Sequence, residues 1–355
     1  MQKLINLLSK KLNMSLKNLS ATIKIPKLLN NKLQKKRINS IYKNFEKNLN
    51  IDEKFVVAVS GGPDSLALAF FAKIYSLKNK LPSKFLIVDH KLRTESTKEA
   101  NNVKKLLKQI SVNAEILTWK GKKPLNNIQS KAREKRYELI FAYCEKFKVK
   151  NILLGHHQDD LFENFFIRMM RGSGLKGLIS LNKEEKIKDK NLLRPLLDQK
   201  KDDLIFTAKN VFDFYVEDLT NIDAKYLRTR VRKLIKELKK DGLDNKKFLK
   251  TIQNLKSSNF VVNFYVKENL KKNTFFSYEK NHLILNNNFF KQPYEVIFRS
   301  LSETIQLIGK KYYSVRGKKL DKIIKDIENN KLIKATLGGC VIEKVHQTVI
   351  IYKEY

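Results

Sequence analysis

Residues 60–65, Ser-Gly-Gly-Pro-Asp-Ser, form a turn of a kind that binds phosphate. The apolar run 55–59 before it is typical of a buried strand, and helical spacing of apolar residues begins at Leu66. Such a turn directs backbone N–H groups and the positive end of a helix dipole at one point, which favours an anion. The turn lacks the glycine–lysine pattern of kinases and GTPases and the glycine fingerprint of dinucleotide-binding proteins. We expect it to bind phosphate; the alternative is an ordinary turn that uses glycine for packing.

A second cluster of reactive side chains occupies residues 155–164, Gly-His-His-Gln-Asp-Asp-Leu-Phe-Glu-Asn. If a helix begins at Asp159 or Asp160, then Asp160 and Glu163 lie on one face of its first turn. The simpler explanation for acidic residues at the start of a helix is their favourable interaction with the helix dipole. One carboxylate would suffice for that interaction, whereas this segment has three. A metal-dependent hydrolase is an alternative that the pattern disfavours, because it lacks a His-x-x-x-His pair and ligands on a second element.

Arg136 lies on a helix predicted by residues 130–140, in line with its apolar stripe. An arginine on a buried face needs a carboxylate, a phosphate or a base as partner. The alternative is an arginine at the edge of the stripe, with its guanidinium in water. The stripe consists of Ile128, Ala132, Ile140, Tyr143 and Phe147.

Residues 223–240 predict a helix with basic residues on all faces but one. Like charges four residues apart repel each other, so a helix with its charge this one-sided indicates an anionic partner. We expect that partner to be RNA phosphate. The predicted apolar stripe is Leu227, Val231, Leu234 and Leu238. The basic residues are Lys225, Arg228, Arg230, Arg232, Lys233, Lys236, Lys239 and Lys240.

The elements that would position these residues alternate between strand and helix. Such alternation predicts an α/β fold with a parallel, doubly wound sheet, whose ligands bind at the carboxyl ends of the strands. Both clusters, and Asp89-His90, directly follow strands. Strands are expected at residues 55–59, 84–89, 114–119 and 151–155, and helices at residues 65–77, 95–110, 127–147 and 160–171.

The alternation stops after Pro195, and the rest of the chain is first helical and then mixed. Helices are expected near 288–307 and 316–329, and Gly338-Gly339 predicts a hairpin turn between β-rich segments. The expected parts are a basic N-terminal extension (1–50), poorly ordered or loosely helical to residue 34 and with a short helix at 35–48, the sheet domain (51–199), a basic helical region (200–272) and a small α+β domain (273–355).

Composition points to a polyanionic partner. The 355 residues include 73 Lys+Arg against 36 Asp+Glu, a formal charge of +37. A lysine-rich proteome accounts for some of the lysine but not for the excess over acids. We expect no membrane span and no signal peptide. The two cysteines, Cys144 and Cys340, have no metal-site spacing, so we expect them in the core of a reduced, cytosolic protein.

Seven motifs in this order resemble the tRNA(Ile)-lysidine synthetases, a branch of the PP-loop ATP-pyrophosphatase superfamily. SGGPDS alone marks the superfamily, whereas the ordered set is specific to the branch and covers about half the chain. The family commonly has Gln, Thr and Pro where Leu161, Asn164 and Leu219 stand, which puts secondary contacts in doubt. The motifs are SGGPDS (60–65), VDHKLR (88–93), AREKRY (132–137), GHHQDD (155–160), RGSGLKGL (171–178), RPLL (194–197) and EDLTN…YLRTRVR (217–232).

The resemblance implies a ligase reaction in two steps. ATP, with Mg²⁺, adenylates the C2 oxygen of the wobble cytidine in the CAU anticodon of tRNA(Ile), releasing pyrophosphate. The ε-amine of free lysine then displaces AMP and forms lysidine, which pairs with A and changes the amino-acid identity from methionine to isoleucine.

The resemblance also implies roles for residues at matching positions, without a fixed metal site in the protein. For ATP these are Ser60, Gly61, Gly62, Pro63, Asp64, Ser65, Asp89 and His90. For lysine they are Asp64, Asp160, Glu163 and Arg228. For tRNA we expect contacts from Arg136, Arg171, Arg230, Arg232, Lys233 and Lys236, of which Lys233 and Lys236 lie outside the motifs and are assigned from the charge of the basic helix. The implied catalytic residues are Asp64, Arg136, His156 and Asp160.

Three rival functions fit less well. Sulfur-inserting PP-loop enzymes need reactive or cluster-binding cysteines, and a PP-loop amidotransferase needs an ammonia source and leaves the charge unexplained. An RNA-binding protein with a degenerate nucleotide fold would not need an intact SGGPDS turn. The sequence leaves the oligomeric state open, a homodimer included.

Overall fold

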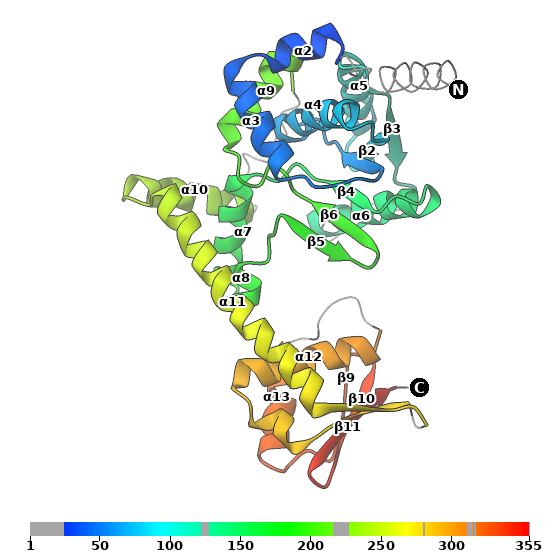
Figure 1. Cartoon of the computed structure of the whole chain (residues 1–355), viewed down its shortest axis with the longest axis vertical. Coiled ribbons are helices and arrows are strands. Elements are labelled where there is room, and N and C mark those ends of the chain that lie inside the picture. Colours follow the sequence, from blue (N-terminus) through cyan, green and yellow to red (C-terminus); the bar gives the residue numbers. More distant parts are fainter. Residues whose placement is uncertain are drawn as a thin grey trace, which may run out of the picture. The chain divides into compact units, whose positions relative to one another are not determined.

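The computed structural model describes residues 25–121, 128–215, 227–279, 281–310, 315 and 317–354. Within these ranges the chain divides into two compact units, one in residues 25–172 and 180–238 and the other in residues 173–179 and 239–354. Each unit has its own sheet and its own apolar core (Figure 1). The first 24 residues of the predicted extension, and Leu219 and Lys225, lie outside the described residues.

The first unit is built on a six-stranded sheet with the order β3-β2-β1-β4-β6-β5. Five strands are parallel, which confirms the predicted fold class, and β5 pairs antiparallel with β6 at one edge. The β5–β6 hairpin was not predicted, because the exposed, charged sequence of β5 lacks an apolar run. The strands are β1 (Phe55–Ala58), β2 (Ser83–Asp89), β3 (Ala114–Thr118), β4 (Asn151–Leu153), β5 (Glu184–Ile187) and β6 (Lys190–Leu193).

Alternate residues of the parallel strands face two different cores, as the pleat requires. Val57 and Leu153 lie in the core on the first face, whereas Val56 and Ile152 lie in the core on the second. The helices of the first face are α2 (Lys27–Leu33), α3 (Lys36–Lys47), α4 (Pro63–Lys78), α5 (Ser96–Lys108) and α9 (Lys201–Phe212), and α6 (Ile128–Lys146) covers the second.

The helices before β1 belong to the core of this unit. Leu29 of α2 and Phe45 of α3 are buried, and the ring centroids of Phe45 and Phe71 of α4 are 5.7 Å apart. The last part of the predicted lead-in is therefore a packed helix. The division into compact units does not follow the predicted boundaries at residues 50, 199 and 272, which stay predictions about functional domains.

Strands β1 and β4 are neighbours whose connections run in opposite directions along the sheet. The chain leaves β1 through α4 to β2, and it returns from β3 through α6 to β4. In doubly wound sheets this reversal opens a crevice outside the carboxyl ends of the strands, where ligands bind. The turn 59–62 before α4 and the turn 154–157 before α7 (Gln158–Met170) both lie at this edge.

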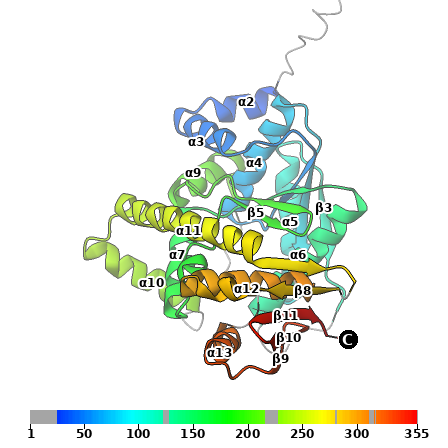
Figure 2. The same ribbon diagram turned by 60° about the horizontal axis from the view of Figure 1, so that its bottom comes forward.

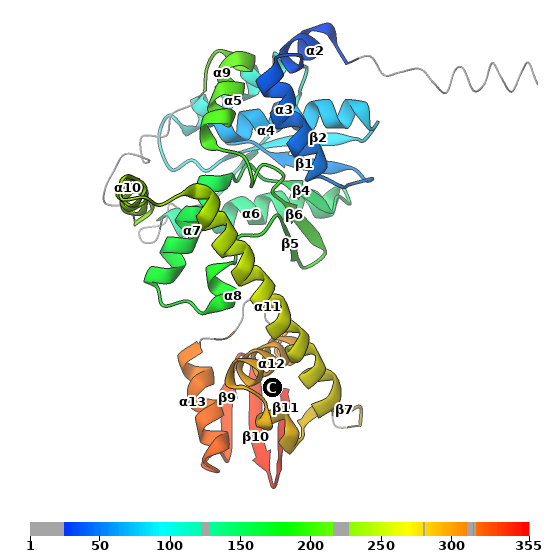
Figure 3. The same cartoon turned by 60° about the vertical axis from the view of Figure 1, so that its left-hand side comes forward.

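The second unit is a five-stranded antiparallel sheet with the order β7-β8-β11-β10-β9, whose strands are clear in Figure 2. Ile305 of α12, Ile324 of α13 and Ile351 of β11 belong to one apolar core. Figure 3 shows α12 and α13 beside the sheet. Its elements are α8 (Leu175–Leu178), α11 (Asn245–Asn273), β7 (Thr274–Ser277), β8 (His282–Leu285), η2 (Asn287–Lys291), α12 (Tyr294–Ile308), α13 (Gly317–Glu328), β9 (Lys334–Leu337), β10 (Cys340–Val345) and β11 (Thr348–Lys353).

The predicted hairpin at Gly338-Gly339 is confirmed. The two glycines have φ angles of +66° and +79°, which side chains disfavour, and they join the antiparallel strands β9 and β10. Both φ values are positive, as a tight two-residue hairpin turn requires.

α11 is long enough to cross a bilayer, at 29 residues, but lysines recur along it. In the ranges that the structure describes, no helix combines the length and the apolar character that a membrane span needs.

Candidate active site

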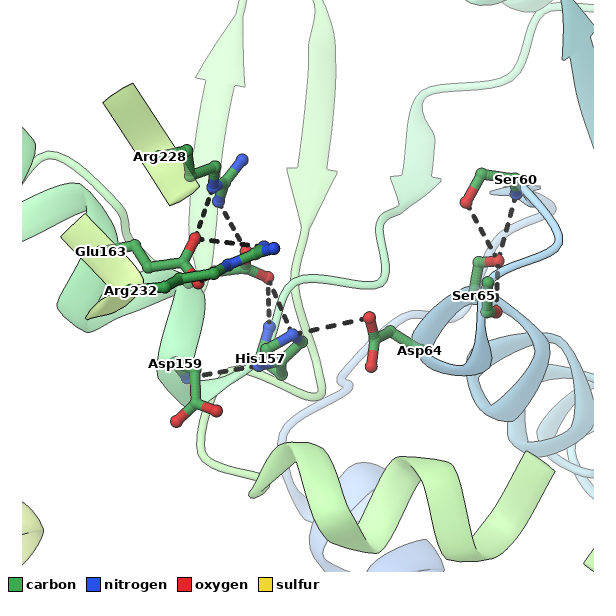
Figure 4. Close-up of polar contacts among 10 residues, drawn as sticks. Ser60, Asp64, Ser65, His157, Asp159, Glu163, Arg228 and Arg232 are labelled. Atoms are coloured by element: carbon green, nitrogen blue, oxygen red, sulfur yellow. Dashed lines mark hydrogen bonds and ion pairs between the residues drawn. The ribbon is translucent and has the colours of Figure 1, made fainter. Parts of the chain in front are cut away.

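The turn between β1 and α4 is organised by the hydroxyl of Ser65. Its Oγ accepts hydrogen bonds from the backbone N–H groups of Ser60 and Gly61, at 3.1 and 3.0 Å, and donates to the Gly62 carbonyl oxygen at 3.0 Å (Figure 4). The N–H groups of Ser60 and Gly61 are therefore used within the turn. A phosphate at this point would meet the N–H groups of the first turn of α4, which have no acceptor within the helix.

Two of the glycines in these turns, Gly61 and Gly155, are needed for the backbone geometry. Gly61 has a φ of +90°, and Gly62, which precedes α4, has open space where a Cβ would stand. A Cβ at Gly155 would lie 3.2 Å from the backbone N and Cα of Ser65. The two turns therefore pack backbone against backbone, and Gly62 leaves a ligand free to approach.

Asp64 and Asp160 are brought together by a residue that the sequence analysis did not assign, His157. The imidazole Nε2 lies 3.5 Å from Asp64 Oδ2 and 3.5 Å from Asp160 Oδ2. Burial alone would lower the pKa of His157, but the hydrogen bond to Asp64 and the negative charges of both carboxylates raise it. Asp64 Oδ1 is buried and has no hydrogen-bond partner in the structure.

The predicted lysine pocket is occupied by ion pairs from α10 (Leu227–Lys240). Glu163 Oε2 accepts from Arg228 Nε, and Glu163 Oε1 accepts from Arg232 Nε at 2.5 Å. Arg228 Nη2 also donates to Asp160 Oδ1 at 2.6 Å. Glu163 is only 3% exposed, so the two guanidinium groups neutralise a buried carboxylate.

Charges around Asp160 keep its side chain ionised. Burial would raise its pKa, but His157, Arg228 and His156 together lower the pKa to about 2. His156 is affected in the opposite way: burial is the main cause that lowers its pKa to about 3, with Arg194 contributing, against the raising effect of Asp160. His156 is therefore a neutral imidazole at physiological pH, and its buried Nδ1 has no hydrogen-bond partner in the structure.

The end of β2 places Asp89 and His90 at the same edge of the sheet. The buried carboxylate of Asp89 accepts from the Lys91 N–H at 3.0 Å and from the hydroxyls of Ser96 and Thr97 at 2.8 and 2.7 Å, so its side chain holds the β2–α5 turn. Burial and the nearby Arg136 lower the pKa of His90 to about 4.

Arg136 was expected on the buried face of α6, and this expectation is wrong. The residue is exposed, and its guanidinium Nε lies 3.4 Å from His90 Nε2. Ile128 and Phe147 are likewise 48% and 43% exposed, because the buried stripe of α6 is narrower than predicted. Arg136 is at the edge of the stripe, as the alternative stated, yet it lies beside a residue that the resemblance assigns to ATP.

The basic residues of α10 divide into two groups. Arg228 and Arg232 face Glu163, whereas Arg230, Lys233 and Lys236 are exposed, as is Arg171 after α7. The predicted stripe has the wrong phase: the buried residues are Thr229, Val231 and Ile235, and Leu234 is 41% exposed. The stripe was misplaced because the two arginines share the inner face, where carboxylates pair with them.

Neither cysteine lies in a reactive setting. Cys144 and Cys340 are both buried, as predicted, and burial raises the pKa of the Cys144 thiol to about 11. In the parts of the chain that the structure describes, no group of three His, Cys, Asp or Glu side chains is arranged to hold a metal ion. The setting disfavours sulfur transfer through a protein thiolate.

Several residues at this edge were not singled out from the sequence. Gln158 Oε1 and Arg194 Nε are buried without a hydrogen-bond partner in the structure, and Arg194 pairs with Glu185 at 2.7 Å. Gln158 lies two residues after His156 in the same motif, which was the available signal. Of the family departures, Leu161 is buried and Asn164 donates to Ser180 Oγ at 3.1 Å, so both have structural roles here.

This fold and this edge define a PP-loop protein, and residues 30–238 match the PP-loop domain family. The tRNA(Ile)-lysidine synthase of Orientia tsutsugamushi (strain Boryong) is 35% identical over 315 residues, which cover 85% of this chain and 70% of that protein. The tRNA(Ile)-lysidine synthase of Wolbachia sp. subsp. Brugia malayi (strain TRS) is 32% identical over 312 residues, covering 85% and 71%. The chain belongs to the tRNA(Ile)-lysidine synthase family, which confirms the resemblance seen in the motifs.

A solved structure shares the fold. The U34-tRNA thiolase NcsA from Methanococcus maripaludis, determined with its iron–sulfur cluster, matches with a TM-score of 0.52 over 62% of this chain and 78% of that one. At 17% identity the likeness concerns the fold alone.

Proposed function

We propose that this protein joins free lysine to the wobble cytidine of tRNA(Ile) bearing a CAU anticodon, at the cost of one ATP. The cytidine C2 oxygen attacks the α-phosphorus of ATP and pyrophosphate leaves. The lysine ε-amine then attacks C2, AMP leaves with the oxygen, and the amine loses a proton. The observation that carries the proposal is the meeting of the 60–65 turn with Asp160, Glu163 and Arg228 at one edge of the sheet, in a chain of this family.

The first step needs a site for a leaving pyrophosphate. The first turn of α4 supplies N–H groups and a helix dipole, and Gly62 leaves space for close approach. Mg²⁺ fits the same place, because Asp64 Oδ1 is a buried carboxylate oxygen without a hydrogen-bond partner in the structure, and Mg²⁺ is commonly bound by one or two carboxylates together with phosphates. The ion would offset the charge that develops on the phosphates.

The cytidine and the adenine nucleotide would lie between the ends of β2 and β4. Arg136 and His90 are 3.4 Å apart there, and His156 has a buried ring nitrogen without a hydrogen-bond partner in the structure. Because His156 and His90 both have lowered pKa values, they are neutral and can hydrogen-bond a base without adding charge.

The second step requires an exchange of partners at Glu163. Both of its oxygens are engaged by arginines in the structure, so a lysine ammonium can pair with Glu163 only if a guanidinium moves. The α-carboxylate of lysine offers that guanidinium a new bidentate partner, and Arg228 is our assignment. Asp160, whose pKa is lowered to about 2, is ionised and would hold the lysine ammonium until that group loses a proton and the neutral ε-amine attacks C2.

The exposed basic residues of α10 would bind tRNA phosphates. Arg230, Lys233 and Lys236 are all on the outer face, and Arg171 is exposed at the end of α7. Arg232 was assigned to tRNA, but its contact with Glu163 favours a role in the lysine pocket. The cytosolic location and a homodimer stay predictions.

The direct test is incubation with ATP, Mg²⁺, lysine and a tRNA(Ile) transcript carrying CAU, followed by mass analysis of the nucleosides. We expect lysidine in place of one cytidine, and none with a CAU-bearing methionine tRNA or without ATP. Unchanged cytidine under all conditions would contradict the proposal.

A further inference from the structure

His157 links the two reactive turns, and the reaction proposed above assigns it no role. It follows β4 and precedes α7, it is only 2% exposed, and its backbone is extended, with φ −132° and ψ −176°. Its ring lies within 3.5 Å of Asp64 in α4 and of Asp160 in α7. Figure 4 shows Asp64 beside the ring.

One ring nitrogen of His157 caps α7. Nδ1 accepts from the Asp159 N–H at 3.2 Å, and Asp160 Oδ2 accepts from the His157 N–H at 3.1 Å, which together form a capping box. Serine, threonine, asparagine and aspartate are the usual capping residues, and they cap a helix without burying a ring. A cap alone therefore does not account for a histidine at this position.

The other ring nitrogen faces the carboxylates. Because Nδ1 accepts a hydrogen bond, the neutral ring carries its proton on Nε2. Nε2 is 3.5 Å from Oδ2 of Asp64 and equally far from Oδ2 of Asp160, so it lies within ion-pair distance of both acids. The contact with Asp64 involves Oδ2 and leaves Oδ1, the oxygen without a hydrogen-bond partner, on the other side of the carboxylate.

We propose that His157 is a positioning residue with a separate task for each ring nitrogen: Nδ1 caps α7, and Nε2–H holds Asp64 in the orientation that presents Oδ1 to the phosphate–Mg²⁺ site. The inference rests on the proposed function, since it assigns Asp64 Oδ1 to that site. The histidine would not touch ATP, lysine or the cytidine. It acts through Asp64, and through the helix that carries Asp160 and Glu163.

Two substitutions separate the two tasks. His157→Asn places an amide oxygen near the position of Nδ1, so it keeps the cap and loses the contact with Asp64. His157→Gln places an amide N–H near the position of Nε2, so it keeps that contact and loses the cap. His346→Asn is a matched control, because His346 lies exposed in the β10–β11 turn with φ +52°, a conformation that asparagine tolerates.

The experiment measures tRNA-dependent pyrophosphate release against MgATP concentration, and thermal unfolding, for the wild type and the three variants. For His157→Asn we expect roughly a 10–100-fold loss of kcat/KM for MgATP, the range found when a group that orients a metal ligand is removed. Its melting temperature should stay near that of the wild type. His157→Gln should keep much more of the activity but melt roughly 2–4 °C lower, as the loss of a helix cap predicts.

The outcomes distinguish this proposal from the proposed function. If the wild type forms lysidine but both variants lose activity equally, or activity follows the melting temperature, the division of tasks is wrong. Full activity in His157→Asn would also overturn it. If the wild type forms no lysidine, the proposed function itself fails, whatever the variants do.

Discussion

The two ends of the candidate site hold charge in different ways. At the phosphate end, the 60–65 turn is organised by backbone N–H groups and the Ser65 hydroxyl, and its one acidic side chain is Asp64. At the lysine end, Asp160 and Glu163 meet Arg228 and Arg232 in a cluster of four charged side chains.

This difference follows from the ligands that the two ends would bind. ATP brings its own negative charge and Mg²⁺, so a dipolar backbone site fits it without competing side chains. Free lysine brings one charge of each sign, so its site needs both signs, and in the substrate-free protein these neutralise each other. The phosphate end is therefore open, whereas the lysine end must exchange ion pairs to bind its substrate.

The largest effect is expected at the phosphate end. Asp64→Ala should lower tRNA-dependent pyrophosphate release by on the order of 10²–10³-fold, because it removes the carboxylate assigned to Mg²⁺. Folding and tRNA binding should persist, since Asp64 lies in the first turn of α4 and is partly exposed. Ser65→Ala should act in the same direction, because the turn loses the hydroxyl that holds its backbone in place.

The control for this variant is Asp52→Ala, an exposed acid three residues before β1. If pyrophosphate release survives both Asp64→Ala and Ser65→Ala, the 60–65 turn does not bind the phosphates of ATP.

The next effect concerns lysine alone. Glu163→Gln removes the buried carboxylate that the partly exposed Arg228 and Arg232 contact and that we assign to the lysine ammonium. Truncating one partner of a desolvated charge pair costs on the order of 2–5 kcal/mol. We expect a steep rise in the lysine concentration needed for lysidine, while adenylation continues. The measurement is the ratio of adenylated tRNA to lysidine, with Glu134→Gln on the exposed face of α6 as control.

An equal loss of both steps in Glu163→Gln would mean that the ion pairs serve the helices rather than the substrate. The two ends would then not be separable.

A smaller effect separates the two faces of α10. Lys233→Gln and Lys236→Gln should weaken cognate and non-cognate tRNA alike, and each should reduce the log–log salt slope by roughly 0.7–0.9. Arg232→Gln should leave the salt slope unchanged and raise the lysine requirement, because its guanidinium contacts Glu163. Binding measured at several salt concentrations decides between them, and an identical slope change for all three variants would refute the division.

The smallest effect is expected at Cys144. Burial raises the pKa of its thiol to about 11, so at about pH 8 the group is protonated and inaccessible. We expect no alkylation of the folded protein by iodoacetamide and no change in activity, whereas both cysteines should react after denaturation. Rapid alkylation of Cys144 with loss of activity would contradict this prediction and would show that its thiol is accessible and needed for the reaction.

The contrast between the two ends also explains what the sequence could predict. The 60–65 turn is local, so an apolar run, a glycine pair and a helix start located it, and β1, β2 and β3 were predicted to within two residues. β5 was missed because an exposed edge strand need not be apolar. The parallel order of β1 and β4 followed from the alternation of strands and helices, which is why both reactive turns were expected at one edge.

The charge cluster was harder to predict because its partners are distant in the chain. Glu163 and Arg232 are 69 residues apart, and nothing in the spacing of basic residues marks which of them face inward. Arg228 and Arg232 occupy the inner face of α10, where a hydrophobic pattern predicts apolar side chains, so the stripe was placed in the wrong phase. His157 was seen in the reactive cluster but given no role, because its contacts with Asp64 and Asp160 depend on distances that the sequence does not show.

The most direct test of two separable ends is a reaction without lysine. The wild type, given ATP, Mg²⁺ and tRNA(Ile) with CAU, should release pyrophosphate and accumulate adenylated tRNA, and added lysine should convert it to lysidine. Glu163→Gln should accumulate the same intermediate even with lysine present, and Asp64→Ala should form neither product. If the wild type releases no pyrophosphate until lysine is added, adenylation does not precede lysine binding, and the proposal that the two ends act in sequence is wrong.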